Sequence, residues 1–348
     1  MTETHEINDS LRRSLIDRLI RRTTDVPYDG NIALNQTEWD WPSGVGLYGI
    51  YQGWKFTGES YYLDYLKKWV DEHLHEADRL RNVNRTAPIL VVHELHALTG
   101  LEQCGHACEQ RADWLLHAAP RTREGGFEHT VSDPEHRFPE QMWADTLFMA
   151  CLFLAKMGKG TGNAAYTEEA LRQLQVHVKA LQDSESGLFY HAYSCETRNW
   201  LSGAHWGRAN AWMLAAGMEM LDHLPDFPER ERVIAAYVKQ AEALQTYQRK
   251  NGMFGTLLDH EDAYDEASAT AGIAYGLKRG IRSGFLPVSF QPVADRAELA
   301  VMLRINGKGE LTEVSHGTDV KRTLAEYKTV PIVPAFWGQG LALMMLSG

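Results

Sequence analysis

The first candidates for chemistry in this sequence are carboxylates that come just before apolar helices, and Asp145 is the most informative of them. It lies in MWADTLFMA, two residues after Trp143 and directly before an unbroken apolar run. A carboxylate in the first turn of a helix is stabilised by the helix amino terminus, which is a purely structural role. A general acid at neutral pH instead needs a raised pKa. A catalytic Asp145 therefore requires apolar walls or a second carboxylate nearby.

A second group of candidates lies in WGRANAW, where Arg208 and Trp212 are four residues apart and share one face of a predicted helix. Trp206 stands at the start of that helix. The guanidinium of Arg208 suits a carboxylate or a set of hydroxyls, although it can equally pair with a neighbouring Asp or Glu. His191, in GLFYHAYS, is expected to reach the same place from the preceding loop, and its alternative is a structural histidine.

Tryptophan recurs at the starts of the predicted helices. A flat indole wall with polar groups beside it suits a sugar ring, whose C–H face stacks while its hydroxyls form hydrogen bonds. Each of these tryptophans can also simply pack a helix end. The six are Trp39, Trp41, Trp143, Trp200, Trp206 and Trp337. Cations in the nearby loops are expected to be solvated and to add positive potential; these are His129, His136, His205, His316, Lys321 and Arg322.

These residues belong to a repeated pattern in the chain. Six segments share a short polar or aromatic lead followed by small and aliphatic residues, as buried helices do. They begin near Trp41, Thr86, Trp143, Trp206, Ser268 and Trp337. A charged, more amphipathic helix is predicted after each of the first five, over 59–76, 102–118, 166–182, 228–249 and 292–304. A helix over 7–22 has no such partner and can pair with the last segment.

Six inner and six outer helices predict an all-α fold, the (α/α)6 toroid, as one domain over residues 1–348. Inner helices run the same way in such a ring, so the loops before them meet on one face, where function is expected. Three of these loops carry a Gly-aromatic pattern that suggests small hairpins. The pattern occurs at 126–127, 187–189 and 252–254.

Composition excludes several classes of partner. The 348 residues include 35 Lys and Arg against 46 Asp and Glu, a formal charge of −11, which disfavours nucleic acid and anionic lipid. Cys104 and Cys108 have a metal-like spacing, but no second pair completes a zinc site. No phosphate-binding glycine motif occurs. We therefore expect no cofactor, no metal, no membrane segment and a cytoplasmic protein that is a monomer or homodimer.

Six motifs, in order from about residue 38 to the end, resemble those of glycoside hydrolase family 105, the unsaturated uronyl hydrolases, which are related to family 88. They are PRTREGGFEH, DTLFMACLFLAKMG, GLFYHAYS, WGRANAWMLAAGMEML, ASATAGIAYGLKRGIRSGF and WGQGLALMML. The resemblance implies removal of a 4,5-unsaturated uronic acid from the non-reducing end of oligosaccharides made by polysaccharide lyases. An acid protonates C4, water adds at C5, and the hemiketal opens and expels the remaining sugar.

The resemblance also assigns roles. It implies that Asp145 is the catalytic acid and that His191, Trp206, Arg208 and Trp212 line the subsite of the unsaturated sugar, with Trp143 in the same wall. The remaining predicted substrate-binding residues are Asp40, Trp41, Thr86 and Trp337.

One departure from the family pattern affects the acid. Better-known members have a second Asp where this chain has RNVNRTAP, residues 81–88, without a carboxylate. Asp40 is the predicted substitute. The departure leaves unsaturated galacturonyl and glucuronyl substrates equally open.

Two other functions stay open at this point. One is a sugar epimerase or isomerase on the same toroid, which needs two histidines facing each other across the pocket. The other is a non-catalytic oligosaccharide-binding protein that retains the aromatic wall.

Overall fold

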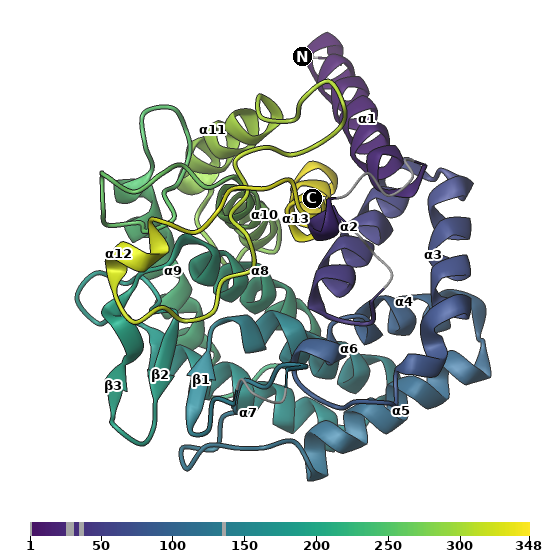
Figure 1. Cartoon of the computed structure of the whole chain (residues 1–348), viewed down its shortest axis with the longest axis vertical. Coiled ribbons are helices and arrows are strands. Elements are labelled where there is room, and N and C mark those ends of the chain that lie inside the picture. Colours follow the sequence, from purple (N-terminus) through teal and green to yellow (C-terminus); the bar gives the residue numbers. More distant parts are fainter. Residues whose placement is uncertain (1, 26–30, 35–37, 134–136) are drawn as a thin grey trace.

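A closed ring of inner helices forms the centre of the molecule (Figure 1). The computed structural model describes residues 2–25, 31–34, 38–133 and 137–348. In these ranges the inner ring has six members, and each packs on the next, with the last returning to the first. They are α2 (Trp41–Thr57), α4 (Ile89–Thr99), α6 (Leu152–Thr161), α8 (Gly207–His223), α10 (Ala267–Arg282) and α13 (Phe336–Ser347).

Six further helices in the described ranges surround the inner ring, which confirms the predicted (α/α)6 toroid. Helix α1 packs on α13, so the predicted pairing of the first and last segments is also confirmed. The outer helices are α1 (Thr2–Thr24), α3 (Ser60–His73), α5 (Glu102–His117), α7 (Ala164–Leu181), α9 (Arg230–Tyr247) and α11 (Gln291–Met302). The shorter elements are η1 (Ile32–Leu34), η2 (Leu74–Glu76), η3 (Asn84–Thr86), the π-helical turn η4 (Leu147–Cys151), η5 (Leu201–Gly203), η6 (Val288–Phe290) and α12 (Leu324–Tyr327).

The small residues of the inner helices let their backbones touch. A Cβ atom placed on Gly49 of α2 would lie 2.4 Å from the carbonyl oxygen of Gly340 in α13. A Cβ atom on Gly340 would in turn lie 2.4 Å from the carbonyl oxygen of Val45. Glycine is therefore required where these two helices meet, because any side chain there would push them apart.

A buried ion cluster joins several inner helices inside the ring. The Lys156 ammonium lies 2.8 Å from the Glu94 carboxylate and 2.9 Å from that of Glu219. Tyr48 and Tyr275 donate hydrogen bonds to Glu219. These five residues come from α6, α4, α8, α2 and α10, so charge pairing ties together helices that are far apart in sequence.

Short strands at one end of the ring bring two loops together. Strands β1 (Gln141–Trp143), β2 (Ala192–Ser194) and β3 (Asn199–Trp200) form an antiparallel sheet in that order. Trp143 pairs with Ala192, which places the segment after β1 beside the residue before β2. The predicted hairpins occur as isolated bridges, at Arg121 with Phe127, Gln182 with Phe189, and Gly255 with Asp265.

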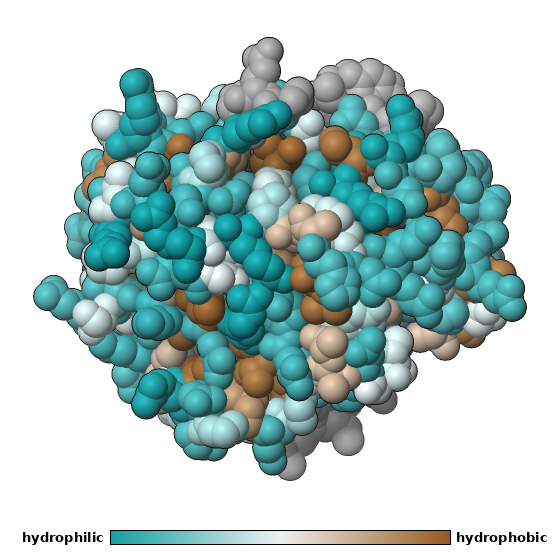
Figure 2. Space-filling model, turned by 90° about the horizontal axis from the view of Figure 1, so that it is seen from below, coloured by the Kyte–Doolittle hydropathy of each residue, from teal (hydrophilic) through white to brown (hydrophobic). Residues whose placement is uncertain are grey.

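The face seen in Figure 2 is mostly hydrophilic, with apolar residues in small scattered patches. In the ranges that the structure describes, no helix is long and apolar enough to span a membrane.

Candidate active site

A narrow cavity opens where the loops before the inner helices meet. Its empty space, counting the open solvent at its mouth, is about 430 Å³. Its lining comes from the starts of α2 and α8, from η3, from the segments that lead into α6, and from the loop between α11 and α12. The lining residues are Trp41, Asn84, His129, Val131, Trp143, Asp145, Met149, Trp206, Arg208, Gly317, Thr318 and Asp319.

Asp145 lies in this cavity as predicted, between β1 and the π-helical turn η4. Such turns are rare and often mark functional sites. Its Oδ2 lies 3.3 Å from Nε2 of His191, but the two groups are not aligned for a hydrogen bond, and neither atom has another partner in the described chain. Burial raises the pKa of Asp145, but His191, His129 and Arg208 outweigh burial and hold it below its ordinary value. The pKa of Asp145 is therefore lowered, as expected for the structural alternative, and not raised as a general acid requires.

His191 lies behind Asp145 and not in the cavity mouth. Its ring is fully buried, 4.1 Å from the ring of Trp206 and 5.4 Å from that of Trp143. Its Nδ1 lies 2.7 Å from the hydroxyl of Tyr327. The sequence predicts a residue that touches substrate, whereas the structure gives His191 contact with Asp145.

Indole rings form the predicted wall. Trp143 stacks on His129, with ring centres 4.3 Å apart and an angle of 6° between the planes. The Nδ1 atom of His129 lies 3.0 Å from the hydroxyl of Thr146. Burial lowers the pKa of His129 to about 4, so this ring is neutral at physiological pH. The expectation that His129 is solvated and cationic is therefore wrong.

Arg208 lines the cavity and also holds the loop that closes it. Its guanidinium donates to the carbonyl oxygens of Ser315 and His316, at 2.9 and 2.8 Å, and to the Ser315 hydroxyl at 2.7 Å. The Glu266 carboxylate lies 3.8 Å away. Both predictions for Arg208 are therefore partly met, since it faces the cavity and also belongs to a structural network.

A second cavity adjoins the first and shares Trp41, Gly317 and Asp319 with it. It encloses about 1050 Å³, counting its mouth, and the rings of Trp41 and Trp337 lie 4.8 Å apart on its wall. Asp40 lines this cavity and not the one that holds Asp145. Its carboxylate accepts hydrogen bonds from the Trp41 N–H and the Ser132 hydroxyl, both at 2.7 Å. Asp40 thus caps the start of α2 and lines a different cavity from Asp145.

Sequence comparison decides the family. The model for Glycosyl Hydrolase Family 88 matches residues 15–347. The chain belongs to glycosyl hydrolase family 88. It is 36% identical over 339 residues to the unsaturated rhamnogalacturonyl hydrolase YesR of Bacillus subtilis, covering 96% of this chain and 93% of that protein. The resemblance stated from the motifs is confirmed.

Solved structures agree with this assignment. A possible member of the GH105 family from Klebsiella pneumoniae superposes with a TM-score of 0.91 at 32% identity, covering 97% of this chain and 92% of the other. The unsaturated glucuronyl hydrolase of Bacillus sp. GL1, at 19% identity and a TM-score of 0.75, shares the fold over 98% of this chain and 94% of its own.

Three residues predicted to bind substrate lie outside both cavities of this family 88 protein: His191, described above, Trp212 and Thr86. Trp212 is buried against Phe148, with ring centres 4.9 Å apart. Thr86 is fully buried; its hydroxyl donates to the carbonyl oxygen of Asn82 and accepts a hydrogen bond from Arg111. Position near the start of an inner helix was therefore not enough to place a side chain in the cavity, because Trp212 and Thr86 are taken up by packing and hydrogen bonds inside the protein.

Other predicted residues have structural roles. Trp39 is buried against Trp69, and Trp200 stacks on Tyr190 near the surface. His205 was expected to be solvated, but it is buried and lies 2.8 Å from Asp259. His136 lies outside the described residues.

Sequence reasoning missed Asn84, Asp319 and the role of His129 in the family 88 cavity. Asn84 lies in the segment noted for its lack of a carboxylate, so its position was the available signal. Asp319 follows SHGT in a loop with no helical pattern, and nothing in its neighbours marked it. Among the described residues, no group of three or more His, Cys, Asp or Glu side chains could hold a metal.

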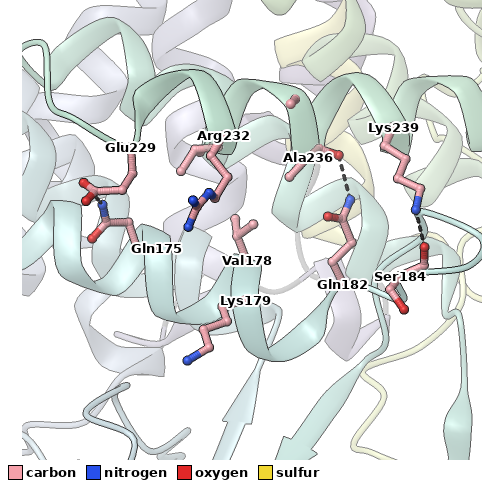
Figure 3. Close-up of a pocket in the computed structure, with 11 residues that line it drawn as sticks. Gln175, Val178, Lys179, Gln182, Ser184, Glu229, Arg232, Ala236 and Lys239 are labelled. Atoms are coloured by element: carbon pink, nitrogen blue, oxygen red, sulfur yellow. Dashed lines mark hydrogen bonds between the residues drawn. The ribbon is translucent and has the colours of Figure 1, made fainter.

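A further groove lies between the outer helices α7 and α9 (Figure 3) and shares none of these residues. Its polar groups bind one another across the helices. Gln182 donates to the carbonyl oxygen of Ala236 at 2.6 Å, and Gln175 to Glu229 at 3.1 Å.

Proposed function

We propose that this protein releases the 4,5-unsaturated uronic acid from the non-reducing end of oligosaccharides produced by polysaccharide lyases. The observation that carries the proposal is a buried carboxylate, Asp145, in a cavity walled by Trp41, Trp143 and Trp206. The names of its relatives, unsaturated rhamnogalacturonyl and unsaturated 3S-rhamnoglycuronyl hydrolases, support it.

The reaction needs one acid. Protonated Asp145 gives its proton to C4 of the enol ether, and the positive charge at C5 is shared by the ring oxygen. Water adds at C5 and returns a proton to Asp145. The resulting hemiketal opens by cleavage of the bond between C5 and the ring oxygen, and the hemiacetal left at C1 then expels the remaining oligosaccharide. This route requires no pair of carboxylates on opposite sides of the bond, unlike ordinary glycosidases.

One cation in the cavity can pair with an anionic sugar, and it stands beside the carboxylates of Asp145 and Asp319. Of the described lining residues, Arg208 is the permanent cation, and its charge favours the uronate carboxylate. The neutral ring of His129, stacked on Trp143, offers a further polar edge. In the adjoining cavity, which we assign to the following sugar, Glu38, Asp40 and Asp319 supply negative charge. We therefore propose that the following sugar is neutral, as rhamnose is, and not sulfated.

The four cysteines are free thiols, which fits a reducing compartment, and we place the reaction in the cytoplasm. The epimerase alternative is less well supported, because His191 does not line the cavity opposite His129.

Loss of ultraviolet absorbance from the conjugated double bond tests the proposal. Unsaturated galacturonyl-rhamnose and glucuronyl disaccharides, with and without sulfate, are the substrates. We expect turnover of at least one unsulfated substrate, and a loss of roughly 10³-fold in kcat for Asp145→Asn with binding retained. Asp226→Asn, a surface carboxylate with 98% of its side chain exposed, is the matched control and keeps wild-type turnover. Unchanged absorbance with every substrate would refute the proposal, and binding without turnover would favour the non-catalytic alternative.

A further inference from the structure

A line of three side chains runs from the cavity to the C-terminal part of the chain. Asp145 Oδ2 lies 3.3 Å from Nε2 of His191, and Nδ1 of His191 lies 2.7 Å from the Tyr327 hydroxyl. His191 and Tyr327 are fully buried. Sequence reasoning singled out the first two residues and gave no role to Tyr327, which is 136 residues from His191.

The hydrogen bonds around Tyr327 fix the direction of its proton. The backbone N–H of Lys321 donates to the Tyr327 oxygen at 3.3 Å. Burial raises the pKa of Tyr327, so the phenol keeps its own proton. That proton can go to Nδ1 of His191, at 2.7 Å, or to Ser202 Oγ, at 3.4 Å. The shorter contact is the stronger one, so Nδ1 accepts it.

Acceptance at Nδ1 decides the tautomer of His191. A neutral imidazole has one N–H donor and one acceptor, so its proton must then be on Nε2, facing Asp145. Burial lowers the pKa of His191, which keeps the ring neutral.

The ring cannot easily turn away from Asp145. It lies between Trp206 and Trp143, and its backbone bonds to Ala204 and Ala144, each at 3.0 Å. Tyr327 is fixed in turn by α12, whose first turn is closed by a capping box between Thr323 and Glu326. The three side chains therefore form a rigid unit.

We propose that Tyr327 is a positioning residue that holds neutral His191 in its Nε2–H tautomer, so that an N–H group, and not a lone pair, faces the Asp145 carboxylate anion. Asp145 then takes its proton from solvent when the anionic sugar arrives. This inference rests on the proposed function.

Other charged groups also face Asp145 and His191 and affect their protonation. Asp145 also interacts with His129 and Arg208, and His191 with Arg208 and Asp319. Removal of the Tyr327 hydroxyl leaves all of these in place. It removes only the donor that occupies Nδ1, so the ring proton of His191 is no longer held on Nε2, beside Asp145.

Tyr327→Phe tests the proposal through kinetics. We expect kcat to fall roughly tenfold with KM changed less than twofold, since the hydroxyl does not reach the cavity. The alkaline limb of kcat/KM should move to higher pH, because the Asp145 anion loses stabilisation. Tyr237→Phe is the matched control, because the buried Tyr237 hydroxyl has no hydrogen-bond partner in the described chain. Wild-type kinetics and an unmoved pH limb in a folded Tyr327→Phe protein would overturn the proposal.

A second measurement needs neither substrate nor variant. Nitrogen-15 NMR of the histidine rings in the wild-type protein reports the tautomer of His191 directly. We expect Nε2–H, and a protonated Nδ1 in the free protein would overturn the proposal even if the enzyme is active. Conversely, an inactive protein with the Nε2–H tautomer would refute the proposed function and leave this structural assignment intact.

Discussion

At the scale of single residues, the surroundings of Asp145 favour its carboxylate anion over the protonated acid. Asp145 is buried, which alone would raise its pKa, yet His191, His129 and Arg208 lower it. An acid with a low pKa is a poor proton donor at neutral pH. The substrate must therefore raise the pKa of Asp145. Its own carboxylate, placed beside Asp145, would do so by like-charge repulsion.

This argument predicts two different pH profiles. The profile of kcat/KM reports the free enzyme, so its alkaline limb should fall at low pH, where Asp145 loses its proton. The profile of kcat reports the complex, in which the bound uronate raises the pKa of Asp145, so its limb should lie at higher pH. Steady-state kinetics across pH 4 to 8 check this. Coincident limbs, or a kcat limb at the lower pH, would contradict it.

The sequence predicted which residues gather in the site better than it predicted what they touch. Trp206 and Arg208 line the cavity at the start of α8, and Trp143 and Asp145 line it just before η4, which leads into α6. The partnership of His191 with Tyr327 was beyond sequence reasoning, since it depends on a loop that has no periodic pattern.

At the scale of elements, the contact between α2 and α13 shows how small residues determine the distance between neighbouring inner helices. A Cβ on Gly49 would lie 2.4 Å from a backbone oxygen, which cannot move aside as a flexible side chain can. The helix pattern itself was predictable because buried helices are apolar on all sides. The close approach of these two helices was not predictable, because Gly and Ala also occur in helices that pack at ordinary distances.

Gly49→Ala should therefore destabilise the protein by about 1–3 kcal/mol through overpacking. Chemical denaturation followed by circular dichroism measures the change in free energy of unfolding. Gly307→Ala is the control, because a Cβ at that position meets no atom within 4 Å and its φ is not positive. Equal stability of the two variants would show that the two helices can separate without cost.

At the scale of the whole molecule, buried neutral histidines make stability depend on pH. Burial lowers the pKa of four of them to about 4, from an ordinary value of 6.5. The unfolded chain binds these protons first, so stability is lost as pH falls below 6.5 toward 4. The four are His93, His129, His177 and His223.

We expect the melting temperature to fall steeply between pH 6.5 and 4, with each histidine contributing at most about 3 kcal/mol. Calorimetry across this range measures it. His177→Gln should make the dependence shallower by nearly one proton, since His177 does not line the cavity and its Nδ1 bonds to the carbonyl oxygen of Gln173. An unchanged slope in that variant would contradict the prediction.

Closure of the ring by its two ends has a kinetic consequence. Gln339 of α13 donates to the carbonyl oxygen of Leu19 in α1, a contact between residues 320 positions apart. Contacts of such long sequence separation form slowly, because much chain entropy is lost before they stabilise anything. Folding should therefore reach an open arc of helical hairpins first. The joint between α13, α2 and α1 would then form last, and only that step would bring the Trp41 and Trp337 walls of the sugar site together.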